Sequence, residues 1–211
     1  MDAFAPVSSS YRWRYLRTGR QKYNRRGEKT AGRGLIPGRV DIEERPEIVE
    51  EKSRIGDWEG DTIIGKNHQG AILSHVDRKS KYTKLVLLPD KSKDSVTKAC
   101  HKVLKNIKSF FETITYDNGK EFAGHKKIAK MLQCDIYFAK PYHSWQRGLN
   151  EHTNGLVRQY FAKGTDFTKL TQADIQIVED RLNRRPRKCL GYKTPYEVFS
   201  KERMKIVAFQ C

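Results

Sequence analysis

Three acidic residues stand at positions from which an α/β sheet could bring them together. Asp61 lies in a β-rich run, Asp117 directly follows another, and Glu151 falls in a stretch with helical character. In open α/β sheets the active crevice forms where strands end and helices begin. Mg²⁺ and Mn²⁺ prefer oxygen ligands, and one or two carboxylates usually hold each ion. The three acids therefore suffice to hold two such ions for an in-line phosphoryl displacement by water or a 3′-hydroxyl.

Each acid also has a simpler explanation. An Asp before Asn-Gly is common in turns, and a Glu on a helix usually faces solvent. The neighbouring residues favour a functional site, because Asp57, Glu59 and Asp61 alternate along one face of the predicted strand. A row of carboxylates on a core-facing strand is costly unless a cation neutralises it.

The predicted helix around Glu151 carries small, polar and basic residues on the face that Glu151 shares. They lie at offsets of −4, −3, +3, +4 and +7 from the glutamate: Arg147, Gly148, Asn154, Gly155 and Arg158. This composition indicates that the face of the helix does not pack into an apolar core.

Hydrophobic patterns predict the elements that position these acids. Strands are expected over residues 57–65, 70–76, 82–88, 113–116 and 136–139, and helices over 91–107, 128–132 and 148–161. Three adjacent strands followed by alternating helices and strands indicate an α/β fold, a mixed five-stranded sheet flanked by helices.

The charge of the chain implies a polyanionic partner. The formal net charge is +17 over 211 residues, while a hydrophobic share of 37% is enough for a packed core. Residues 1–40 contain ten Lys or Arg and two acids, with aromatic residues interleaved around Trp13. We predict a basic arm and acidic linker over residues 1–50 without an independent core, a catalytic domain over 51–203 and a short tail over 204–211.

Cysteine spacing and hydropathy exclude several other classes. No CxxC pair is present, so neither a zinc ribbon nor a dithiol redox site is indicated, and the four thiols are expected to be reduced. No apolar run is long enough to span a membrane, and the N-terminus lacks the pattern of a signal peptide. The expected location is cytoplasmic and nucleoid-associated, in a bacterium, with no membrane partner.

Four strings resemble the catalytic region of the IS-thirty family of bacterial insertion-sequence transposases. They are Gly34-Leu35-Ile36-Pro37, the run from Ile55 to Gly65 that contains Asp57-Trp58-Glu59-Gly60-Asp61, the run from Thr115 to Phe122 that contains Asp117-Asn118-Gly119, and the run from Pro141 to Glu151 that ends in Gly148-Leu149-Asn150-Glu151. The segment Asn183–Pro195 is similar too, and the resemblance extends from about residue 11 to residue 199.

The resemblance implies a ribonuclease-H-like integrase core with a DDE triad of Asp61, Asp117 and Glu151. It also implies two Mg²⁺ or Mn²⁺ ions, and it places the family's basic residue, seven positions after the glutamate, at Arg158. Relatives usually carry a helix-turn-helix before this core. Residues 1–50 show no paired amphipathic helices, so we expect that part to be lacking.

The expected partner is double-stranded DNA, both transposon ends and target, with a homo-oligomer assembled on it. The candidate DNA contacts are Lys120, Lys140, Arg147, Arg158, Arg184 and Arg185. A solvated basic face is the alternative for these residues. Two other functions stay open: a truncated, non-enzymatic DNA-binding remnant that interferes with an intact transposase, and a ribonuclease acting on RNA–DNA hybrids.

Overall fold

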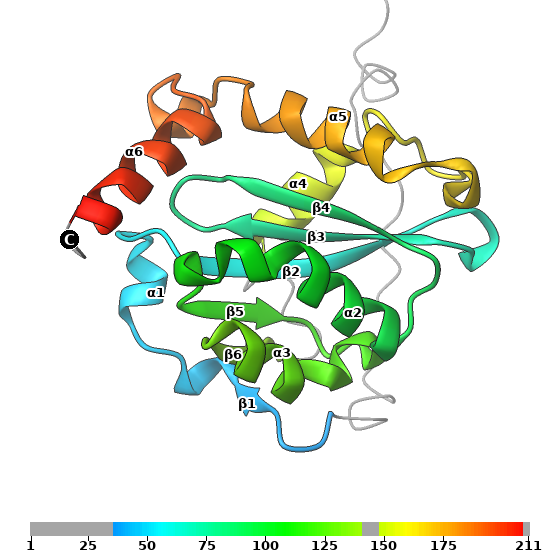
Figure 1. The fold of residues 1–211 in the computed structure, drawn as a ribbon, viewed down its shortest axis with the longest axis horizontal. Helices are drawn as coiled ribbons and strands as arrows, with labels where there is room; N and C mark the ends of the chain where they lie inside the picture. The colour runs from blue at the N-terminus through cyan, green and yellow to red at the C-terminus, as the bar shows by residue number, and fades with distance from the viewer. Residues whose placement is uncertain (1–35, 141–147, 209–211) are drawn as a thin grey trace, which may run out of the picture. The chain divides into compact units, whose positions relative to one another are not determined.

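The described residues fold around a mixed six-stranded sheet with helices on both faces (Figure 1). The computed structural model describes residues 36–140 and 148–208. The strands are β1 (Val40–Asp41), β2 (Asp57–Ile64), β3 (Ala71–Asp77), β4 (Thr83–Leu88), β5 (Thr113–Tyr116) and β6 (Asp135–Phe138). Their order across the sheet is β1-β6-β5-β2-β3-β4. The predicted α/β class is confirmed.

All five predicted strands are present, and the sheet gains a sixth. The strands β2, β3 and β4 form an antiparallel meander, whereas β5 pairs in parallel with both β2 and β6. The additional strand β1 pairs in parallel with β6. The prediction of five strands therefore missed one strand, β1. This strand is only two residues long, which is too short for an alternating pattern to be recognised.

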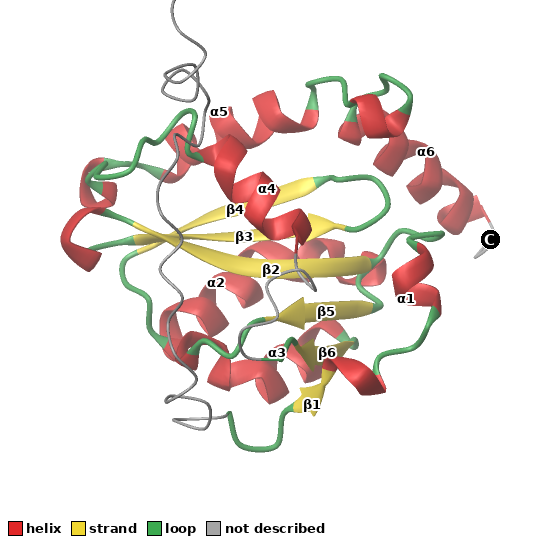
Figure 2. Cartoon of the chain, turned by 180° about the vertical axis from the view of Figure 1, so that it is seen from behind, coloured by secondary structure: helices red, strands yellow, loops and turns green. Residues whose placement is uncertain are grey.

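The helices divide between the two faces of the sheet (Figures 1 and 2). They are α1 (Ile48–Glu51), α2 (Lys93–Leu104), α3 (His125–Leu132), α4 (Gly148–Val157), α5 (Gln172–Asn183) and α6 (Pro195–Ala208). One apolar core joins Leu73 and Val86 to α2 and α3, and the other joins Ile72 and Leu85 to α4 and α5. Alternate residues of β3 and β4 therefore face opposite cores, as the pleat requires.

The predicted boundaries at residues 50 and 203 differ from the structure. Ile36, Ile42 and Val49 are buried, so the described part of the predicted arm, residues 36–50, packs on the rest of the described fold. The chain divides instead between Arg33 and Gly34. At the other end, α6 runs past residue 203 to Ala208, because no glycine or proline interrupts it. The predicted basic arm around Trp13 and the question of a helix-turn-helix lie largely outside the described residues.

Polar side chains of α5 cover the free edge of β4. The Asn183 side chain accepts a hydrogen bond from the Thr83 amide and donates one to the Thr83 carbonyl, each at 2.8 Å. Glu179 accepts from the Leu85 amide at 2.7 Å, and Gln172 donates to the Leu85 carbonyl at 3.2 Å. An unpaired strand edge is a template for association with another chain. The helix thus takes the place of a seventh strand.

We expect Asn183→Ala to lower the free energy of unfolding by about 2 kcal/mol, because it leaves the buried amide and carbonyl of Thr83 without partners. The variant should also self-associate through the exposed edge of β4. Urea unfolding and sedimentation velocity measure the two effects. Ile177→Ala is the matched control, since Ile177 lies on the same helix with 53% of its surface exposed. Wild-type stability in the Asn183 variant would contradict the role of α5 as an edge cover.

Candidate active site

Asp61 lies on β2, and Asp117 lies just beyond β5, the parallel neighbour of β2. Glu59 of β2 is paired in register with Thr115 of β5, and each aspartate stands two residues further along its strand direction. Residues two apart share a face of a strand, so the sheet directs Asp61 toward the face covered by α4. Asp117 directly follows the end of β5. Both carboxylates are half-buried.

Each of the two carboxylates is oriented by hydrogen bonds. Asp61 Oδ2 accepts from Asn154 Nδ2 at 2.7 Å, and its Oδ1 accepts from the Thr62 amide at 2.8 Å. Asp117 Oδ1 accepts from the Gly119 amide at 2.9 Å, which closes the turn after β5. The turn expected from Asp-Asn-Gly is therefore present, and it fixes the carboxylate rather than leaving it to solvent.

Glu151 lies in the first turn of α4, which crosses β2 and β3 (Figure 2). The helix is held there by polar contacts, since Asn154 also accepts from Ser74 Oγ at 3.2 Å and the Asn150 amide donates to Glu59 at 3.3 Å. Glu151 itself is exposed. Within residues 36–140 and 148–208, no three His, Cys, Asp or Glu side chains are grouped closely enough to hold a metal ion.

The other two acids of β2 are neutralised by arginines. Arg54 binds the buried Asp57 at 3.0 Å, and Arg78 lies 3.5 Å from the buried Glu59. Burial lowers the pKa of Arg78, although Glu59 and Asp57 oppose this effect. The acidic row that favoured a metal site is therefore explained at these two positions by guanidinium groups. The third acid of the row, Asp61, accepts hydrogen bonds from the Asn154 side chain and the Thr62 amide.

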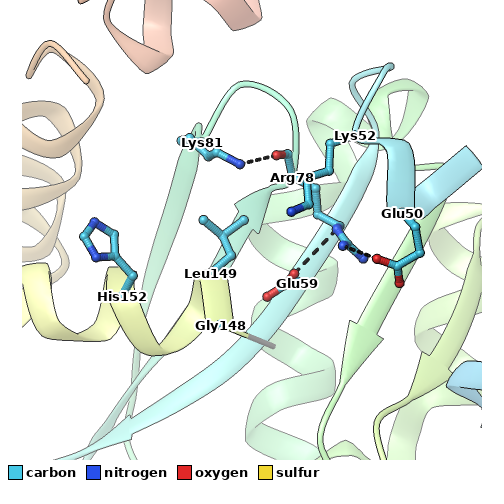
Figure 3. A pocket seen from close by; sticks show the side chains of 8 residues that line it. All are labelled: Glu50, Lys52, Glu59, Arg78, Lys81, Gly148, Leu149 and His152. Atoms are coloured by element: carbon cyan, nitrogen blue, oxygen red, sulfur yellow. Dashed lines mark hydrogen bonds and ion pairs between the residues drawn. The ribbon is translucent and has the colours of Figure 1, made fainter. Parts of the chain in front are cut away.

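A cavity of about 480 Å³ lies beside this site (Figure 3). Its lining residues are Glu50, Lys52, Glu59, Arg78, Lys81, Gly148, Leu149 and His152. Arg78 spans it between Glu59 and Glu50, donating to Glu50 at 2.9 Å, and Lys81 donates to the Arg78 carbonyl. Burial and the charge of Lys52 lower the pKa of Lys81. The cavity thus joins the start of α4 to the ion-paired end of β2.

Gly60 lies between Glu59 and Asp61 on β2 and packs against a buried polar pair on the opposite face of the sheet. The ring nitrogen His75 Nε2 and the Tyr116 hydroxyl are hydrogen-bonded at 2.8 Å. Burial lowers the pKa of His75 to about 3, so the ring is neutral at pH 7, and burial raises the pKa of Tyr116. A Cβ on Gly60 would lie 2.2 Å from Tyr116 Cε1. Only glycine allows this close packing behind Asp61.

Glu121 connects the segments that carry Asp61 and Asp117, and sequence reasoning missed it. Its buried carboxylate accepts from Thr62 Oγ1 at 2.8 Å and pairs with Lys91 at 2.9 Å. A Cβ on Gly119 would lie 2.4 Å from its Oε2. Glu121 therefore packs beneath the turn after Asp117 while holding the residue after Asp61. Its place in the string Asp117-Asn118-Gly119-Lys120-Glu121 was the available signal.

The candidate DNA contacts have different surroundings. Lys120, the residue directly after the Asp-Asn-Gly turn, has an exposed side chain. Arg184, the residue directly after α5, is also exposed. Lys140 pairs with Glu43, and Arg185 is exposed with a contact to Gln159 at 3.4 Å. Arg147 lies outside the described residues.

Arg158 is engaged within the protein. Its guanidinium donates to the Ile64 carbonyl at 2.7 Å and lies over the Phe167 ring at 5.6 Å. The side chain therefore joins the end of α4 to the end of β2. This contact accounts for a basic residue at this position without DNA.

This sheet, with its antiparallel meander and parallel β5 and β6, has the ribonuclease-H-like fold that integrase catalytic cores share. The catalytic core of BIV integrase superposes with a TM-score of 0.53 at 20% identity, covering 72% of this chain and 98% of that one. A simian T-cell lymphotropic virus intasome chain gives a TM-score of 0.55 at 19% identity, covering 68% of this chain and 54% of that one. These likenesses concern the fold.

Sequence comparison relates the chain to insertion-sequence transposases. It is 55% identical to the transposase of element IS4351 from Bacteroides fragilis, over 94% of this chain and 65% of that protein. It is 40% identical to transposase InsI of element IS30A from Escherichia coli, over 88% of this chain and 48% of that protein. It is 38% identical to the transposase of element IS1086 from Cupriavidus metallidurans, over 88% of this chain and 55% of that protein. No protein-family model matches the chain.

Along nearly its whole length the chain is therefore similar to insertion-sequence transposases, that of IS30A among them, and this is the resemblance that its motifs predicted. It spans between 48% and 65% of the length of these three relatives. Within its described residues, no helix has the length and apolar character needed to cross a membrane.

Proposed function

We propose that this chain is the catalytic part of an insertion-sequence transposase, which cleaves DNA at the ends of the element and joins the 3′-hydroxyl to a target strand. Similarity to named transposases along nearly the whole chain carries this proposal. The positions of Asp61 on β2 and of Asp117 directly after the neighbouring β5 support it, because neighbouring carboxylates can hold the metal ions that phosphoryl transfer uses.

Asp61, Asp117 and Glu151 are proposed to hold two Mg²⁺ or Mn²⁺ ions. Their donor set fits these metals, since all three offer carboxylate oxygens and two of them, Asp61 and Asp117, are half-buried. Bound divalent ions activate the attacking oxygen and stabilise the leaving oxygen. Asn154 would keep Asp61 oriented through its 2.7 Å hydrogen bond, and Glu151 would complete the set from the first turn of α4.

The proposed partner is double-stranded DNA, both transposon ends and target, with several copies of the chain assembled on it in the bacterial nucleoid. The net charge of +17 suits a polyanion. Among the predicted contacts, the exposed Lys120, Arg184 and Arg185 are the best placed to reach phosphates. Lys140, Arg147 and Arg158 belong to the same proposal.

Strand transfer with pre-cleaved transposon ends tests the proposed function. We expect the chain to join labelled ends to plasmid DNA with Mg²⁺ or Mn²⁺, and to bind DNA without joining it in EDTA. Cleavage of RNA–DNA hybrids without any joining would favour the ribonuclease. Binding without reaction in every metal would favour the non-enzymatic remnant.

A further inference from the structure

The connection between α5 and α6 is a closed, hydrogen-bonded loop. The Arg187 amide donates to the Lys193 carbonyl at 3.0 Å, and the Tyr192 amide donates back to the Arg187 carbonyl at 3.0 Å. The Arg187 side chain donates to the Leu182 carbonyl at 3.1 Å, which ties the loop to the end of α5. Residues 187–193 therefore form one compact surface feature.

Tyr192 is displayed by this loop at a conformational cost. It has 72% of its surface exposed, the highest value among the exposed large hydrophobic residues of the described chain. Its φ is +64°, in the left-handed region that bulky L-residues rarely adopt. The preceding residue is glycine, also at positive φ, so two consecutive left-handed residues turn the chain at this point. Residues held in such regions often serve a function.

The sequence on either side of Tyr192 is strongly cationic. Between Arg181 and Tyr196 the sequence has no acidic residue, whereas it contains these bases: Arg181, Arg184, Arg185, Arg187, Lys188 and Lys193. Arg184, Lys188 and Lys193 are exposed. A second tyrosine, Tyr196, is 53% exposed in the first turn of α6. Aromatic rings among cations are typical of surfaces that bind single-stranded nucleic acid by stacking.

We propose that Tyr192 stacks on an unpaired base of bound DNA while the surrounding cations contact the phosphates. The choice of DNA as the ligand rests on the proposed function. The stacking itself needs no metal ion and no catalysis. A base inside a duplex hides its faces between its neighbours, so this site should prefer DNA with an unpaired overhang.

Fluorescence anisotropy of labelled duplexes in EDTA tests this preference with the full chain. We expect the wild type to bind a duplex with a short unpaired overhang about tenfold more tightly than the blunt duplex of the same sequence. Tyr192→Ala should lose that difference while keeping its affinity for the blunt duplex. Tyr192→Phe, which retains the ring, should keep the preference. The exposed Ile177→Ala serves as the matched surface control.

A base analogue reports the stacking directly. The fluorescence of 2-aminopurine in the overhang should be quenched by the wild type and by Tyr192→Phe, and unquenched by Tyr192→Ala. The proposal would be overturned if Tyr192→Ala showed the same overhang preference and the same quenching as the wild type. It would also be overturned if the wild type showed no preference for the overhang. Because these measurements use EDTA, they are independent of whether strand transfer occurs.

Cys189 offers a further readout in the same loop. It is an exposed free thiol, whereas Cys100 and Cys134 are buried and burial raises the pKa of each to about 12. In a Cys211→Ser background, the Cys189 thiolate should attack a mixed disulfide tethered to the overhang, forming the protein–DNA disulfide and releasing the small thiol of the tether, and Cys189→Ser should abolish this cross-link. Cross-linking only to thiols inside the duplex would contradict the placement of the unpaired base.

Discussion

Strand transfer is expected to fall by about three orders of magnitude or more in each of the variants Asp61→Asn, Asp117→Asn and Glu151→Gln. Each amide keeps the shape of the side chain and removes one charged oxygen ligand, so metal binding should weaken while DNA binding persists. Losses in double variants should be far from additive, because the three carboxylates would act as one unit. Joining of labelled ends to plasmid DNA, with binding measured in parallel, checks both expectations.

The other acids of β2 are not suitable controls for these amide variants. Asp57 and Glu59 are buried against Arg54 and Arg78, so their amide variants would each remove one carboxylate from a buried ion-paired group and reduce stability. The exposed Asp90 provides the control Asp90→Asn, which should retain activity. Substantial joining by Asp117→Asn, or metal-independent joining by the wild type, would refute the proposed triad.

Gly60→Ala is expected to lower the free energy of unfolding by about 3 kcal/mol and to abolish strand transfer. The added methyl would lie 2.2 Å from the Tyr116 ring, which is itself fixed by His75 and by stacking on Phe122 at 4.1 Å. Neither the ring nor β2 can yield without displacing its neighbours. Because Asp61 is the next residue, the displacement would reach its carboxylate. Thermal unfolding and the joining assay measure the two losses.

Gly148→Ala provides the matched control for that substitution. A Cβ on Gly148 would meet no described atom within 4 Å, and alanine is favoured over glycine in a helix. Gly148→Ala should therefore keep or slightly raise the melting temperature. A Gly60→Ala variant with wild-type melting temperature and activity would show that the buried Tyr116 can move, and would remove the steric argument.

Local sequence patterns predicted most of the elements and the candidate acids. The five longer strands and the helices over residues 91–107, 128–132 and 148–161 have periodic apolar residues, and this signal depends only on near neighbours in the chain. The helix α5 carried a similar signal that the prediction left out. Ile175, Val178 and Leu182 share one face of it, and Thr171 with Asp174 forms a capping box at its start.

Other features depend on contacts between distant residues and left no local signal. β1 is two residues long and exists because β6 offers it a parallel partner. The guanidinium groups that neutralise the acids of β2 come partly from the turn after β3, where Arg78 follows the strand. Nothing in the alternation of Asp57, Glu59 and Asp61 distinguishes an arginine partner from a metal ion, because both neutralise the same charge.

The amino-acid sequence by itself determined the spacing of the acids, the basic charge and the alternation of strands and helices, since these are properties of composition and periodicity. The tertiary structure decided that β2, which carries Asp61, lies beside β5, which Asp117 follows. It also decided that Glu121 connects their segments and that α5 covers the edge of β4. Thr62 and Glu121 are 59 residues apart, and Leu85 and Glu179 are 94 apart. Such pairs meet only when the sheet register and the helix packing are fixed, because side-chain hydrogen bonds act over a few ångströms of space.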